Sequence, residues 1–368
     1  MKRLVLMFTF TVLLLACLIC PGGADAQDRD VQPDGPIDAA TRKQMIDTVL
    51  QHLNDSYVFP EVAKAMDKSI RERAAKGEYD QITSSQTFAE TLTNNLRAIS
   101  KDRHLGIHYS NAVLPEREPR REPTAKDREQ ERRNLSWMNY GFDKIERLRG
   151  NTGYIGFRGF FGPELGAEAV ASAMNFVAGT DALIFDLRNN GGGDPEMVAL
   201  ICSYLFGPEP VHLNDLYWRE GNRTEEFWTR KEVAGKRYLN KDVYVLTSKY
   251  TFSGAEEFTY NLKNLKRATI IGETTGGGAH PGTGFRISEH FILFVPMGRA
   301  ISPITKTNWE GTGVKPDIEV PAEQALTVAR LMALKKSLPS ITNPDFKEGV
   351  QGEIEKLEKE LTELKAKK

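Results

Sequence analysis

The chain has 368 residues, of which 40% are hydrophobic, 27% are charged and three are cysteines. This composition is typical of a globular protein and excludes a disordered chain, a collagen and a small disulfide scaffold. The 49 basic and 50 acidic residues give a formal net charge of −1. A near-neutral chain has no overall attraction to nucleic acid or to an anionic membrane, so neither partner is expected.

Residues 1–26 have the layout of a secretory signal peptide. Lys2 and Arg3 precede an almost unbroken apolar run that ends at Ile19, and an Ala-x-Ala cleavage site ends at Ala26. The run is short for a membrane-spanning helix, which needs about 20 residues. We therefore expect a secreted or periplasmic protein without a transmembrane span after processing. Lipid attachment at Cys17 is the alternative.

Removal of residues 1–26 would leave Cys202 as the one cysteine of the mature chain. An intramolecular disulfide and a Cys–His zinc cluster are then excluded. Cys202 lies in an apolar segment, which predicts a buried thiol. No metal or organic cofactor is expected.

Residues 27–112 are expected to form a small helical domain. Apolar residues recur there at intervals of three or four, the spacing of one helix face: Ile46, Val49, Leu50 and Leu53; Val62, Met66 and Ile70; Phe88, Leu92, Leu96 and Ile99. Residues 113–150 begin with three prolines among many alternating charges, which predicts a solvated linker.

Residues 151–335 are expected to form an α/β domain of mostly buried strands. Strands are predicted at 153–157, 182–187, 243–246, 268–271 and 291–295, with helices near 164–178, 195–206 and 254–266. Residues 336–368 predict a C-terminal amphipathic helix, because Ile354, Leu357, Leu361 and Leu364 follow helical spacing. This helix could pack back on the chain or mediate weak self-association, so a homo-oligomer stays open.

Ser253 lies between a predicted strand and a predicted helix. A hydroxyl at such a corner points away from the carboxyl end of the strand, and the amide of Gly254 lies at the helix N-terminus, where unpaired N–H groups favour negative charge. A nucleophile beside an oxyanion donor needs this arrangement. An N-cap is the equally weighted alternative for Ser253. Glu256 and Glu257, in the first turn, are expected to serve the helix dipole.

Three consecutive glycines, residues 191–193, follow another predicted strand and suggest a loop whose amides point into a site. They do not match a phosphate-binding motif. Among the six histidines, His104 stands out because it follows a predicted helix end at a turn.

Five short motifs in order resemble the C-terminal-processing (tail-specific) serine protease superfamily. They are Asp102-Arg103-His104, the segment 186–193, Thr251-Phe252-Ser253-Gly254-Ala255-Glu256, the segment 272–277, and Gly313-Val314-Lys315-Pro316-Asp317-Ile318. The resemblance covers about residues 40–330 and is closest to the branch of tricorn core protease and interphotoreceptor retinoid-binding protein. It implies a helical N-terminal domain on a crotonase/ClpP-like core of spiral ββα units.

The resemblance also implies roles for individual residues. Ser253 falls on the nucleophile, His104 on the general base and Glu310 on a supporting glutamate. Gly254, Gly192 and Gly193 fall on the oxyanion-hole region. A second glycine-rich loop is expected to line the substrate cleft through Gly276, Gly277, Gly278 and His280, although for His280 no role at all is the favoured interpretation.

Three departures from the superfamily matter. Gly278 stands where the tail-specific branch has its lysine base, so His104 becomes the natural base. The segment between His104 and Gly150 is too short for a peptide-binding PDZ module. Arg103 stands where tricorn has a serine beside its active-site histidine.

The leading hypothesis is therefore a serine peptidase acting on a peptide or protein substrate. The alternative is a non-catalytic carrier of a hydrophobic ligand such as a retinoid or a fatty acid, the function of the retinoid-binding relatives. The joint presence of Ser253, His104 and Glu310 favours the hydrolase, since a carrier does not require them. An enoyl-CoA-type enzyme of the same core fold is disfavoured by the signal peptide and the serine turn.

Overall fold

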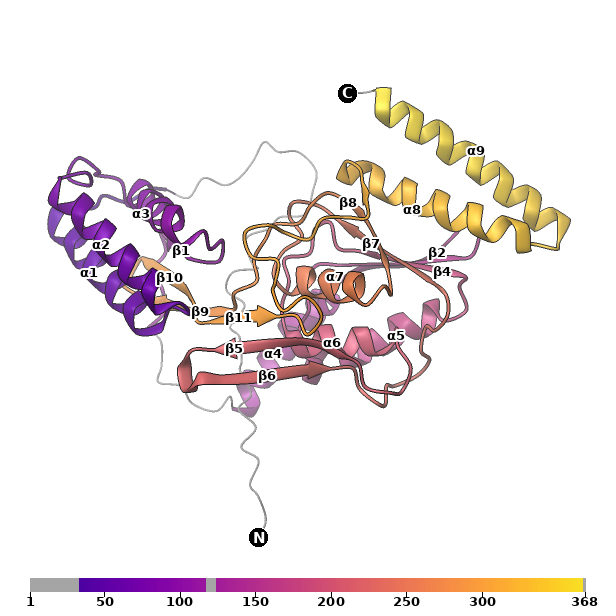
Figure 1. Cartoon of the computed structure of the whole chain (residues 1–368), viewed down its shortest axis with the longest axis horizontal. Helices are drawn as coiled ribbons and strands as arrows, with labels where there is room; N and C mark the ends of the chain where they lie inside the picture. The colour runs from indigo at the N-terminus through magenta and orange to yellow at the C-terminus, as the bar shows by residue number, and fades with distance from the viewer. Residues whose placement is uncertain (1–32, 117–123, 367–368) are drawn as a thin grey trace, which may run out of the picture.

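The computed structural model describes residues 33–116 and 124–366 (Figure 1). The expected signal peptide, including Cys17, lies outside these ranges. Within them, no helix combines the length and the apolar character needed to cross a membrane.

A six-stranded sheet with the order β12-β8-β7-β4-β3-β2 forms the centre of the larger part of the molecule. Its strands are β2 (Phe142–Leu148), β3 (Thr152–Phe157), β4 (Ala182–Asp186), β7 (Asp242–Thr247), β8 (Thr269–Gly272) and β12 (Ile318–Glu319). Neighbouring strands are parallel, except that β2 runs antiparallel to β3. Burial of β4 and β7 on both faces explains their continuous apolar sequence.

Helices cover both faces of this sheet. The helices α5 (Pro163–Val177), α6 (Pro195–Ser203) and α7 (Gly254–Asn264) share one core with the strands, around Phe185 and Phe258. On the opposite face, α8 (Ala322–Ser337) packs its alanines on Ile184 and Tyr244. The last helix, α9 (Pro344–Ala366), lies on α8 and not on the sheet (Figure 1).

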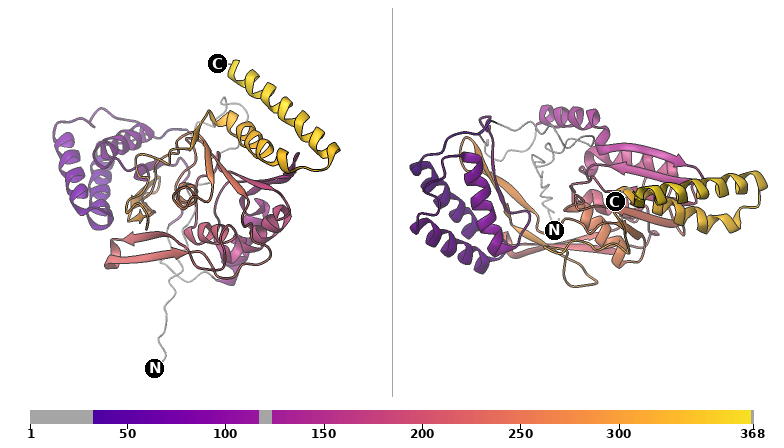
Figure 2. Two further views of the ribbon diagram at one scale, coloured as in Figure 1. Left: turned by 45° about the vertical axis from the view of Figure 1, so that its right-hand side comes forward. Right: turned by 90° about the horizontal axis from the view of Figure 1, so that it is seen from above.

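The N-terminal helices are α1 (Ala39–Ser56), α2 (Pro60–Ala75) and α3 (Ser85–Ser100). Strand β1 (Gly106–Tyr109) follows them and pairs with β10 (Phe291–Pro296), which pairs with β9 (Gly282–Arg286). Phe291, Leu293 and Val295 of this distant hairpin share one core with the three helices. Figure 2 shows these helices and the α8–α9 pair at opposite ends of the molecule.

A third sheet joins β11 (Gly298–Ile301), β5 (His212–Trp218) and β6 (Arg223–Trp228) in antiparallel order. The remaining elements are helix α4 (Ala125–Trp137) and the short 3₁₀ turns Asn139–Gly141, Glu220–Asn222 and Leu338–Ser340.

The α/β class with N-terminal helices is confirmed, and the structure changes several details. Residues 113–150 are not only a linker, because they contain α4 and the edge strand β2, which pairs with β3. Residues 291–295 form a strand, but that strand completes the core of the N-terminal helices and lies outside the central sheet. The C-terminal helix begins at Pro344 and not at residue 336, and α8 spans the expected boundary. Cys202 is buried, as expected.

Candidate active site

Ser253 lies at the turn from β7 into α7, at the carboxyl edge of the central sheet. Its backbone has φ 53° and ψ −121°, which is unfavourable for a residue with a side chain. The turn is fastened to the loop after β4, because the Thr251 hydroxyl donates to the Leu187 carbonyl at 2.8 Å and the Phe252 amide donates to the Asn190 carbonyl at 3.1 Å. The strained turn and the glycine loop are thereby held against each other.

The second and third glycines of that loop adopt positive φ angles, 103° at Gly192 and 140° at Gly193. A Cβ atom on Gly192 would lie 2.6 Å from the Gly254 nitrogen and 2.8 Å from the Ser253 Cβ, so only glycine allows this approach. The Gly192 amide itself donates to Asn190 Oδ1 at 2.9 Å. No hydrogen bond among the described residues uses the amides of Gly193 and Gly254.

Glu256 is fully buried and joins Ser253 to the second glycine-rich loop. Its carboxylate accepts hydrogen bonds from the amides of Ser253 at 3.0 Å, Gly277 at 2.6 Å and Gly278 at 2.7 Å, and from the Thr275 hydroxyl. Burial raises the pKa of Glu256 to about 7, although these hydrogen bonds act in the opposite direction. The expectation that Glu256 serves only the helix dipole is therefore incomplete.

His104 packs beside the residue that precedes the serine. Its ring centroid is 4.6 Å from that of Phe252, and a Cβ atom on Gly278 would lie 2.6 Å from His104 Cε1. The His104 Nδ1 atom is buried and has no hydrogen-bond partner. Burial lowers the pKa of His104 to about 4, so the imidazole is neutral near pH 7. Within the described residues no hydrogen bond joins His104 to Ser253.

Glu310 accepts hydrogen bonds from two backbone amides, one directly before His104 and one directly after Gly278. Its carboxylate accepts from the Arg103 amide at 3.1 Å and from the Ala279 amide at 2.5 Å. The pKa of Glu310 is raised, first by burial and then by Asp102. Arg103 therefore contributes its backbone amide to this hydrogen bond. The bond does not depend on which side chain stands at position 103.

His280 is buried, and its ring contacts carboxylates of the protein itself. Its Nδ1 lies 2.7 Å from Asp102 Oδ2 and 3.5 Å from Glu310 Oε2, and the Tyr57 hydroxyl donates to the same Asp102 oxygen at 3.1 Å. Asp102, His280 and Glu310 thus present three ligand atoms within 4.8 Å of one another, the one such group in the described ranges. The Asp102–His280 hydrogen bond and the two amides that Glu310 binds hold these three side chains together.

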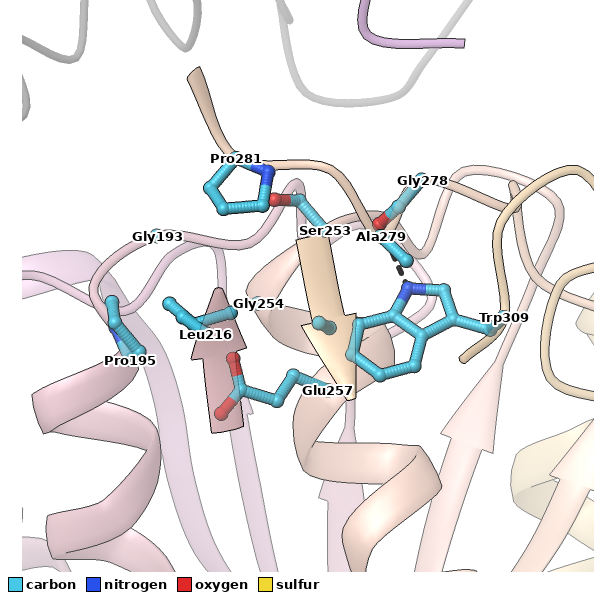
Figure 3. Close-up of a pocket in the computed structure, with 11 residues that line it drawn as sticks. Gly193, Pro195, Leu216, Ser253, Gly254, Glu257, Gly278, Ala279, Pro281 and Trp309 are labelled. Carbon is cyan, nitrogen blue, oxygen red and sulfur yellow. Dashed lines mark hydrogen bonds between the residues drawn. The ribbon is translucent and has the colours of Figure 1, made fainter. Parts of the chain in front are cut away.

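A small pocket opens beside Ser253 (Figure 3). Gly193, Gly254 and Gly278 line it together with Ser253, and Trp309 forms a wall, fixed by a 2.7 Å hydrogen bond from its indole N–H to the Gly278 carbonyl. Gly276 and Gly277 are buried and are not among the residues that line this pocket. Glu257 lies at the end of the pocket opposite Ser253. The sequence-based expectation for Glu257 was the helix dipole alone; the signal for a second role was the pair of acidic residues directly after Ser253-Gly254-Ala255.

Comparison with known proteins identifies both parts of the chain. The description "Peptidase family S41" matches residues 151–320, and "N-terminal domain of Peptidase_S41 in eukaryotic IRBP" matches residues 39–136. Together these matches cover most of the chain. The chain belongs to peptidase family S41.

This S41 protein is similar to carboxyl-terminal-processing peptidase 2 of Arabidopsis thaliana, with 28% identity over 164 residues, which are 42% of this chain and 29% of the relative. It is also similar to the tail-specific protease of Haemophilus influenzae, with 34% identity over 98 residues, 26% of this chain and 13% of the relative. The chain thus spans less than a third of the length of either relative.

A solved structure supports the fold of the S41 protein. A lipoprotein from Streptococcus agalactiae superposes with a TM-score of 0.52 at 15% identity, covering 80% of this chain and 96% of that one.

Proposed function

We propose that this S41-family protein is a serine peptidase with Ser253 as its nucleophile. The observation that carries the proposal is the strained turn at Ser253, beside which the amides of Gly193 and Gly254 make no hydrogen bond to any described residue. The preceding residue of this turn, Phe252, packs on the neutral ring of His104. Strain of this kind persists where the surrounding structure holds a residue for a task.

In the proposed reaction, the Ser253 oxygen attacks the carbonyl carbon of a peptide bond while His104 takes the hydroxyl proton. The amides of Gly193 and Gly254 stabilise the oxyanion, and Gly192 acts by permitting their approach. Collapse of the intermediate breaks the C–N bond, and His104 returns its proton to the leaving amine. Water activated by His104 then hydrolyses the acyl-enzyme. Glu310 holds the segments on either side of His104 in place.

A peptide library digested by the wild type tests this proposal. Analysis by mass spectrometry should show new cleavage products for the wild type and none for Ser253→Ala, while His104→Ala should lose nearly all turnover. Equal turnover in the three proteins would contradict the mechanism.

We further propose that residues 1–26 direct the protein out of the cytoplasm. The layout of the sequence supports this. Expression of the full chain in its own host, fractionation and intact-mass measurement should find a mature protein that begins at Gln27. A lipid-modified product that begins at Cys17 would support the alternative.

The match of residues 39–136 to a domain of IRBP keeps a carrier of a hydrophobic ligand as the second candidate. A folded wild type that cleaves no peptide and binds a fatty acid or a retinoid with micromolar affinity would favour this function.

A further inference from the structure

Glu257 is the one titratable side chain that lines the pocket beside Ser253 (Figure 3). The other side chains that line the pocket include Leu216, Ala300, Trp309 and Pro195. An acid opposite Ser253 in a pocket whose other side chains are mostly apolar needs an explanation, because burying a carboxylate without a partner is costly.

No cationic side chain among the described residues pairs with this carboxylate. Glu257 is 5% exposed, and its Oε1 atom is buried without a hydrogen-bond partner. The charged groups that act on it are the carboxylates of Asp194 and Glu196, and burial together with them raises the pKa of Glu257 to about 8. The polar side chain of Asn214 acts against this rise, and the buried thiol of Cys202 is a further neighbour.

We propose that this pocket receives a lysine side chain of the substrate, at the position immediately before the cleaved bond, with Glu257 as the specificity-determining residue. This inference rests on the proposed peptidase function. Ser253 and the proposed oxyanion donors Gly193 and Gly254 line this same pocket, so we assign a side chain that enters it to the residue whose carbonyl is attacked.

Lysine fits the chemistry of the pocket along its whole length. The unbranched methylene stem can pass between the apolar walls, and the ammonium group then meets Glu257 in a field made negative by Asp194 and Glu196. A paired ammonium favours the ionised carboxylate and lowers its pKa. Binding near pH 7 should therefore release a proton from Glu257.

Isothermal calorimetry on the Ser253→Ala protein tests the proposal without requiring catalysis. The probes are two acetylated peptide amides that differ only in a central lysine or norleucine, and buffers of different ionisation enthalpy report protons released. We expect the lysine peptide to bind at least about tenfold more tightly, with release of a proton. Ser253→Ala/Glu257→Gln should lose both the preference and the proton release.

Glu196→Gln in the same Ser253→Ala background is the matched control. It removes a nearby negative charge from the exposed side chain of Glu196 and leaves the pocket intact, so most of the preference should persist. Equal binding of the two peptides, or a lysine preference that survives Glu257→Gln, would overturn the proposal.

The failure of the inference is distinguishable from the failure of the proposed function. A wild type that cleaves library peptides without preference for lysine contradicts the inference alone. A wild type that binds the lysine peptide through Glu257 but cleaves nothing contradicts the peptidase proposal alone.

Discussion

At the residue scale, Gly278 sits where two aromatic rings leave no room for a side chain. A Cβ atom there would lie 2.3 Å from Phe252 Cζ and 2.6 Å from His104 Cε1. Gly278→Ala should therefore displace the base and the residue before the nucleophile, and we expect kcat/KM to fall by about 100-fold or more. In Gly179→Ala the new Cβ meets nothing within 4 Å, so this control should keep its activity. Full activity in Gly278→Ala would contradict the described site.

The pH dependence of activity reports the environment of His104. Its pKa is lowered by burial to about 4, so the base becomes protonated only as the pH falls through that value. The acid limb of kcat/KM should therefore lie well below the ordinary histidine pKa of about 6.5. A profile measured between pH 3.5 and 7 checks this, and a midpoint near 6.5 would mean that the ring is exposed to solvent.

Glu257 should make stability depend on pH in a defined direction. Its pKa in the folded protein, about 8, lies above the ordinary value of 4.5, so the folded state holds the proton more tightly. Its contribution to the free energy of unfolding is complete below pH 4.5. This contribution is lost between pH 4.5 and 8, at about 1 kcal/mol per pH unit or somewhat more. Glu257→Gln should therefore gain stability relative to the wild type over this range. Urea unfolding at pH 5 and pH 8 measures the difference, and parallel profiles would contradict it.

Single residues of the site could be anticipated where a local pattern carries the signal. The strand-to-helix turn drew attention to Ser253, and consecutive glycines marked a loop that must approach another backbone closely. The partners of Glu256 and Glu257 could not be anticipated. Glu256 binds the amides of Gly277 and Gly278, about twenty positions away, and Glu257 faces a pocket wall contributed by β5. Such contacts depend on how elements pack.

At the scale of elements, α9 is held to α8 by a small apolar cluster that includes the fully buried Leu357. Leu357→Ala should cost about 2–5 kcal/mol of the free energy that keeps this helix pair together. Figure 1 shows that the pair lies away from α7, the helix that directly follows Ser253, so activity should be unchanged. Urea unfolding and a peptidase assay check both statements, with the exposed Glu355→Ala as control. A loss of activity without a loss of stability would contradict this separation.

Whether a segment forms a helix or a strand was predictable where its apolar periodicity was strong. The elements against which it packs were not predictable. The apolar strands 182–187 and 243–246 lie in the centre of the sheet, as their sequence indicates. The equally apolar segment 291–295 belongs with helices more than 190 residues earlier, because Phe291, Leu293 and Val295, on one face of β10, pack into their core. The charged segment before β3 concealed β2, whose half-exposed edge position needs few apolar residues.

At the scale of the whole molecule, the N-terminal helices depend on a hairpin from the far half of the chain. Phe291, Leu293 and Val295 complete their core, and Arg219 donates to the carbonyls of Tyr57 and Asn54 at 2.8 Å and 2.9 Å. A fragment of residues 33–112 should therefore lack a fixed tertiary structure on its own. Well-dispersed amide signals in the NMR spectrum of this fragment would contradict the interdependence.

Labelling with a fluorophosphonate probe shows whether Ser253 is an activated nucleophile. The intact mass of the wild type, beside that of Ser253→Ala, gives the number of adducts and their dependence on this residue. An activated Ser253 should give one adduct on the wild type and none on the variant, with identical circular dichroism spectra. A folded wild type that takes no label, or a variant that is labelled equally, would contradict it.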